Sequence, residues 1–151
     1  MRCLACALAV LLAASAPAFA DEPVRGAPNW TLIDSVTADC WAETGNGANF
    51  APGDTIHIKV MFNDRDRVIL MGARPDWKRL GPVAFGLSID GGDPEIMRGN
   101  NANSLVITEI DPALVDRLRA ASRIEWQLPW GAFSANVSGL GIALDAVDDC
   151  W

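Results

Sequence analysis

The beginning of the chain limits what the rest of it can fold into. Arg2 supplies a positive charge, residues 4–14 form an apolar run rich in leucine and alanine, and residues 18–20 read Ala-Phe-Ala. A basic start, an apolar stretch and small residues in this order are typical of a secretory signal, here cleaved after Ala20. The sequence therefore predicts a mature chain of 131 residues that works in a bacterial periplasm or outside the cell.

Removal of the signal also changes the cysteine content. Cys3 and Cys6 leave with it, so that Cys40 and Cys150 remain. One pair of cysteines in an oxidising compartment favours a structural disulfide. A reactive thiol or a metal site is the alternative, but a metal site needs three or four ligands and His57 is the sole histidine. We therefore expect a bond between Cys40 and Cys150, no metal and no other cofactor.

The charge of the mature chain excludes one class of partner. Residues 21–151 contain 11 basic and 19 acidic residues, a net charge of −8. Such a chain repels phosphate backbones, so we expect no nucleic-acid binding. No apolar stretch after the signal approaches the roughly 20 residues that cross a bilayer, so we expect no transmembrane segment after cleavage. The length fits one domain, and we expect a monomer or a weak oligomer.

The pattern of apolar residues predicts a β-rich domain. Residues 21–29 contain two prolines and little apolar content, which is typical of a mobile leader. In residues 55–62 apolar and polar side chains alternate, a polar turn follows, and residues 68–71 resume as a strand, which predicts a hairpin. Residues 82–90 alternate in the same way. Further strands are expected at residues 30–36, 39–43, 95–98, 105–108, 123–128 and 130–138.

Two helices are expected in the second half of the chain. Asp111 followed by Pro112 is a strong helix start, and apolar residues recur at helical spacing through residue 121. Ser138 can cap a final helix that ends near Cys150. The sequence thus predicts one mainly β (α+β) domain over residues 30–151, either an antiparallel β-sandwich or a partly open barrel with two short helices.

The segment at residues 74–79, Arg-Pro-Asp-Trp-Lys-Arg, interrupts the strand pattern. Arg74, Lys78 and Arg79 concentrate positive charge on an acidic chain, and we expect Trp77 to be the most exposed tryptophan. An exposed tryptophan beside arginine is typical of an interface anchor. A tryptophan in such a loop more commonly folds back onto the sheet and covers the core, and we expect this for Trp77 ahead of the exposed anchor. These four residues are the candidate interaction residues.

The residues of the usual catalytic sites do not cluster in the sequence. His57 is expected on the solvated side of its strand, with no nucleophile or orienting carboxylate nearby. We therefore predict no catalytic residues and no enzyme activity, but a non-catalytic binding or accessory protein that acts through protein–protein contact. The alternative is an inhibitor or immunity-type protein that blocks an enzyme with one loop. An inhibitor needs a rigid protruding loop at residues 74–80, whereas an accessory protein needs a broad flat face.

Three segments resemble a known group of secreted proteins. They are Trp30 ahead of a cysteine, Leu87-Ser88-Ile89-Asp90-Gly91 at the end of a strand, and Val137-Ser138-Gly139-Leu140 with Ala143-Leu144. The chain resembles the small periplasmic proteins of the invasion-associated locus B type over most of its mature length. The resemblance implies a secreted, disulfide-bearing, β-rich protein, linked by name to host-cell invasion and without an established enzymatic activity.

Overall fold

The computed structural model describes residues 21–34, 40–45, 54–63, 67–102 and 104–150. The predicted signal at residues 1–20 and Trp151 lie outside this range. The elements in chain order are β1 Asp21–Pro23, β2 Trp30–Asp34, β3 Cys40–Thr44, β4 His57–Asn63, β5 Arg67–Ala73, β6 Leu80–Ile89, β7 Glu95–Ala102, β8 Leu105–Ile110, α1 Pro112–Arg119, β9 Arg123–Leu128, β10 Gly131–Asn136 and α2 Leu140–Asp149.

The strands form one antiparallel sheet in the order β1-β2-β3-β4-β5-β8-β7-β6-β9-β10. This sheet does not close into a barrel; its two halves pack face to face instead. Within one half, Phe85 of β6 stacks on Trp126 of the adjacent strand β9 with ring centroids 4.6 Å apart. A Cβ on Gly72 of β5 would lie 3.3 Å from the Trp126 ring. The prediction of a mainly antiparallel, sandwich-like β fold with two short helices is confirmed.

The predicted alternation places the core correctly. Ile56, Ile58 and Val60 are fully buried, and β4 pairs with β5 as the predicted hairpin. On β6, Phe85 and Leu87 point into the core in the same way. Apolar side chains at every second position thus supply the buried face of both halves of the sheet.

The first residues after the predicted cleavage point do not form a mobile leader. Asp21–Pro23 pairs with β2 as an edge strand, and Val24 and Ala27 are buried in the core. The backbone N–H of Val24 donates to the carbonyl of Trp30 at 2.9 Å. The prediction for residues 21–29 is wrong because an edge strand tolerates proline, which has no N–H to donate.

The two helices begin in different ways. Asp111 caps α1 as predicted, with its carboxylate accepting from the backbone N–H of Leu114 at 2.8 Å. The prediction that Ser138 caps α2 is wrong, because Gly139 takes the N-cap position with φ of 86° and offers no side chain. A Cβ at Gly139 would lie 2.7 Å from the Cβ of Ala27, so close packing requires glycine there.

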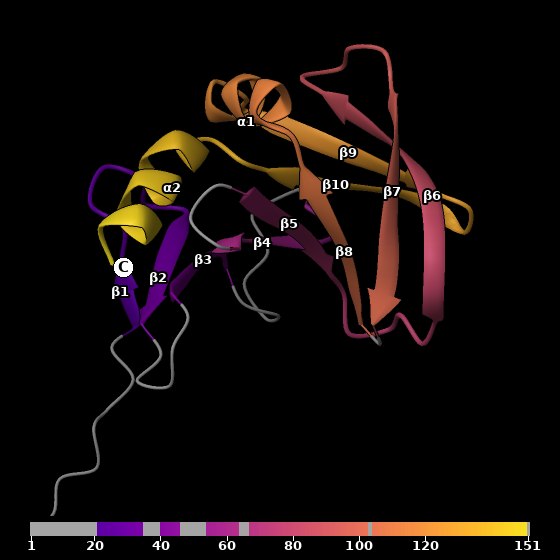
Figure 1. Cartoon of the computed structure of the whole chain (residues 1–151), viewed down its shortest axis with the longest axis horizontal. Coiled ribbons are helices and arrows are strands. Elements are labelled where there is room, and N and C mark those ends of the chain that lie inside the picture. The colour runs from indigo at the N-terminus through magenta and orange to yellow at the C-terminus, as the bar shows by residue number, and fades with distance from the viewer. Residues whose placement is uncertain (1–20, 35–39, 46–53, 64–66, 103, 151) are drawn as a thin grey trace, which may run out of the picture.

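The helices and the β6–β7 hairpin lie at different places in the molecule. Helix α2 packs on β2, β3 and β4, and α1 lies beside it. The hairpin of β6 and β7 lies at the opposite side of the molecule from α2 (Figure 1). No helix of the described residues is long and apolar enough to cross a membrane.

Candidate interaction surface

The turn between β5 and β6, residues 74–79, is tied to the segment that precedes β8. The backbone N–H of Arg74 donates to the carbonyl of Ser104 at 2.9 Å, and the N–H of Ser104 donates to the carbonyl of Trp77 at 3.0 Å. The N–H of Trp77 closes the turn on the carbonyl of Arg74 at 3.2 Å. These three bonds hold the turn close to the body of the protein, so it is not a protruding loop.

Trp77 is a core residue. Its side chain is 6% exposed and makes edge-on contacts with Trp130 at 6.2 Å and Phe133 at 5.1 Å between ring centroids. Of the two positions that the sequence left open, the cover over the core, which was the favoured one, is observed, and the exposed anchor is not. The turn directs Trp77 inward because the rings that follow β9 leave an apolar surface that this indole covers.

The charged residues of the turn separate into two groups. Arg74 is engaged: its Nε lies 2.6 Å from Asp76, and its guanidinium stands 5.3 Å from the Phe133 centroid. The hydrogen bond from Arg74 lowers the pKa of Asp76. Lys78 and Arg79 are exposed, with Arg79 lying 4.6 Å from the centroid of the Trp130 ring. These two side chains therefore present the positive charge of the turn to solvent.

Two of the basic side chains that have no ion pair among the described residues belong to this turn. Six of those in the described residues have a carboxylate partner: Lys59, Arg67, Arg74, Arg117, Arg119 and Arg123. Four have none among the described residues: Arg25, Lys78, Arg79 and Arg98. Three of these four belong to the turn and to β7, and Arg98 lies opposite Ala84 in the β6–β7 register.

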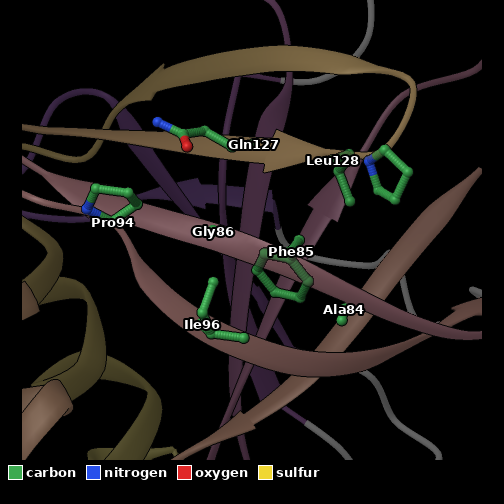
Figure 2. Close-up of a pocket in the computed structure, with 8 residues that line it drawn as sticks. Ala84, Phe85, Gly86, Pro94, Ile96, Gln127 and Leu128 are labelled. Carbon is green, nitrogen blue, oxygen red and sulfur yellow. The ribbon is translucent and has the colours of Figure 1, made fainter.

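The outward side of β6 and β7, which we call the hairpin face, is unusually apolar for a solvated surface. Leu80 and Ile96 are 79% and 77% exposed, the largest values among the big apolar side chains described. Between the strands lies a hollow of about 300 Å³. Figure 2 shows Gly86 in the middle of this hollow, with Pro94 and Ile96 on one side and Gln127 on the other.

Sequence reasoning missed the hairpin face, although a signal for it was present. The alternation over residues 82–90 assigns the large side chains to the core, and it leaves Ala84 and Gly86 at the outward positions of β6. Small outward residues on a strand with neighbours on both sides leave a hollow. The exposure of Ile96 and the placement of Arg98 beside that hollow depend on the pairing of β6 with β7, which the sequence pattern does not give.

His57 belongs to a separate cluster on β3 and β4. Its strand neighbour Lys59 forms an ion pair with the buried Glu43 at 2.5 Å, and the indole N–H of Trp41 donates to the same carboxylate at 3.2 Å. The Lys59 ammonium also stands 5.7 Å from the Trp41 ring centroid. Glu43 is therefore already engaged by two partners, and His57 is half-buried beside them rather than fully solvated.

This environment predicts a contribution of His57 to acid sensitivity. Burial and then the charge of Lys59 lower the pKa of His57 below 6.5, against opposing effects of Glu43 and the backbone of Thr44. The unfolded chain then binds a proton more readily than the folded one as the pH falls through 6.5, so folding stability declines toward the lowered pKa. We expect His57→Gln to flatten this part of the profile of stability against pH, measured by urea unfolding. An unchanged slope would contradict this assignment.

The two cysteines meet at the end of α2. Cys40 begins β3 and Cys150 follows α2, and they are joined across 110 residues with Cα atoms 6.2 Å apart. A shallow pocket beside them is lined by Glu22, Asp34 and Asp149. A cysteine pair at disulfide distance fits a protein located outside the cytoplasm.

Comparisons with known proteins support the fold. The structure is similar to the crystal structure of invasion associated protein B from Bartonella henselae, with a TM-score of 0.58 and 16% sequence identity. The similarity covers 79% of this chain and 91% of that chain. No family model matches the sequence, and no curated protein matches it. The resemblance suggested by the sequence is thus confirmed for the fold.

Proposed function

We propose that the mature chain is a periplasmic or secreted, non-catalytic binding or accessory protein that contacts an acidic surface of a partner protein. The observation that carries this proposal is the position of Lys78, Arg79 and Arg98, three cations without a carboxylate partner among the described residues. On a chain of net charge −8, such a local reversal of charge favours association with acidic partners and suppresses other contacts.

The geometry of the turn supports a broad contact rather than a plugging loop. Its backbone bonds to Ser104 and the burial of Trp77 keep the turn close to the sheet, next to the start of β6. The inhibitor alternative needs a loop that protrudes into an active site. The engagement of Glu43 by Lys59 and Trp41 also supports a structural role for the His57 cluster, since a catalytic histidine needs an orienting group of its own.

A charge-reversal experiment tests the proposal. The double variant Lys78→Glu/Arg79→Glu is expected to weaken capture of the native partner from a periplasmic extract by about tenfold or more. Arg25→Glu is the matched control, because Arg25 is exposed and equally lacks a carboxylate partner among the described residues but lies between β1 and β2. Both variants should keep the wild-type melting temperature. Equal capture by the double variant and the control would refute the proposed surface.

A further inference from the structure

We infer that the hollow on the hairpin face receives a branched apolar side chain from an extended, acidic segment of the partner. This inference rests on the proposed function and identifies the part of the partner that binds. The hollow, the exposed Ile96 and the unpaired Arg98 are the observations that lead to it.

The floor of the hollow is formed by the smallest side chains of β6. Ala84 and Gly86 occupy successive outward positions, and the larger Pro94, Ile96 and Gln127 rise on either side. A Cβ on Gly86 would lie 3.1 Å from the Cβ of Pro94 and 3.2 Å from Oε1 of Gln127, so glycine allows both walls to stand close. Pro94 and Gln127 thus cover the buried Gly86, and the open part of the hollow lies over the exposed Ala84, where the apolar lining by Ile96 and Leu128 suits an aliphatic side chain.

The pairing of β6 decides how a ligand can approach. β6 is hydrogen-bonded to β7 on one side and to β9 on the other, so its backbone is not available for strand addition. A ligand must therefore bind across the face through its side chains. Outward positions repeat every two residues, about 6.6 Å along a strand, which matches the spacing of alternate side chains in an extended peptide.

The exposed apolar residues of the face also favour a protein ligand. Leu80 and Ile96 stand on the same outward side, because Leu80 pairs with Ala102 and Ile96 with Gly86 in the antiparallel register. They lie six register positions apart, about 20 Å along the strands, with the exposed Pro82 and Ala84 between them, and exposed apolar surface of this kind marks interaction sites. A partner segment that covers both side chains removes this surface from water.

Charge determines the direction of the segment. Arg98 stands beside Ala84 in the middle of β6, and the basic turn with Arg79 immediately precedes the first residue of that strand. At the other end stands Glu125 of β9, which pairs with Ser88 and accepts a hydrogen bond from Nε2 of Gln127 at 3.1 Å. An acidic stretch therefore fits over the arginines, with the apolar side chain entering the hollow next to it and uncharged residues continuing toward Glu125.

The test uses a defined peptide probe. A capped peptide of about seven residues spans the face at ~3.3 Å per residue; its sequence is Asp-Glu-Asp-Ser-Leu-Ser-Thr. Titration into the isotopically labelled mature protein is followed by the NMR shifts of the backbone amides. We expect saturable shifts at Ala84, Gly86 and Ile96. A second peptide with serine in place of leucine should bind about tenfold more weakly.

A variant that fills the hollow distinguishes peptide binding in the hollow from peptide binding to the basic turn. Ala84 is exposed, so Ala84→Leu should leave folding intact and weaken the leucine peptide about tenfold. Ala113→Leu, at an exposed position of α1 that does not line the hollow, is the matched control and should bind as the wild type does. Melting temperatures of both variants show whether either substitution disturbs the fold.

The outcomes distinguish the hollow from the proposed function as a whole. If the NMR shifts are confined to residues 74–79 and are equal for the leucine and serine peptides, the inference about the hollow is refuted. The proposal of an acidic partner is not affected by that result. Absence of any saturable shift would overturn it as well, while partner capture by the Lys78→Glu/Arg79→Glu variant decides the proposed function separately. Binding of the protein to anionic phosphatidylglycerol vesicles through Leu80 and Ile96, with no peptide binding, would assign the face to a lipid surface and refute the inference.

Discussion

Replacing Trp77 with alanine is expected to lower the free energy of unfolding by about 3–5 kcal/mol. The indole is 6% exposed and fills the space between Trp130 and Phe133. Its removal deletes the largest apolar side chain of the turn and leaves a cavity under the aromatic rings, and both effects destabilise the folded state. Urea unfolding monitored by circular dichroism measures the change.

A matched variant distinguishes lost volume from lost aromatic contact. Trp77→Phe keeps a ring in the same place and removes an indole N–H that has no hydrogen-bond partner among the described residues. It should therefore destabilise the protein much less than Trp77→Ala. A change below about 1 kcal/mol for Trp77→Ala would contradict the buried position, since surface substitutions typically have effects of this size or smaller.

The burial of Trp77 also affects how the basic turn is tested. Arg79 lies on the Trp130 ring, which in turn contacts Trp77, so Trp77→Ala should loosen the position of the Arg79 guanidinium. Weaker partner capture by Trp77→Ala is then an indirect effect that accompanies a lower melting temperature. Charge reversal at Lys78 and Arg79 acts without such a change in stability, and this difference separates a positioning effect from a direct contact.

The local sequence was sufficient for the strands after β1 and for one helix start. Period-two alternation identifies the buried side of β4 and β6 because a strand exposes alternate residues to one face. Asp111 with Pro112 identifies the start of α1 because both act within a single turn. These features depend on residues close together in the chain, so the sequence displays them directly.

The features that the sequence did not determine depend on contacts between residues that are distant in the chain. The capping of α2 is decided by Ala27, which excludes a side chain at Gly139, and the order of residues 21–29 depends on pairing with β2. The inward direction of Trp77 was favoured only because it is the commoner outcome, and the residue that decides it, Trp130, follows β9. The composition of residues 21–29 and 74–79 is typical of solvent-exposed segments. Composition contains no information about which distant surface a segment covers.

The candidate surface was predictable only in part. Lys78 and Arg79 are recognisable as a local reversal of charge on an acidic chain. The antiparallel pairing of β6 with β7 places Arg98 opposite Ala84, on the hairpin that this turn leads into. The hollow needs a third strand, because Gln127 of β9 forms one of its walls. The charge of the site is thus visible in the sequence, while its shape requires the order of the strands.

Loss of the Cys40–Cys150 bond is expected to be the second large effect on stability. The bond closes a loop of 110 residues, for which the chain-entropy model gives about 4–5 kcal/mol. The double variant Cys40→Ala/Cys150→Ala should lose approximately this amount in urea unfolding. Reduction of the wild-type protein should lower its stability to a similar extent, whereas the same reductant should leave the double variant unchanged.

Helix α2, which the Cys40–Cys150 disulfide links to β3, has few other stabilising interactions at its ends. Gly139 provides no side-chain cap, and Asp148 and Asp149 place negative charge at the end of α2 where the helix dipole is also negative. Packing of Leu140, Leu144 and other apolar residues on the sheet therefore maintains the helix together with the disulfide. We expect the amides of the last turn of α2 to exchange with solvent fastest after reduction, before those of β4 and β5.

Mass analysis gives the direct test of this bond. Intact mass before and after reduction and alkylation should show no alkylated thiol in the natively purified mature protein and two after reduction. Two alkylatable thiols without reduction would refute the bond and with it the expected loss in stability. If the bond forms but α2 exchanges no faster after reduction, the apolar packing of the helix is sufficient by itself. The disulfide then acts mainly by restricting the unfolded chain, as the entropy model assumes.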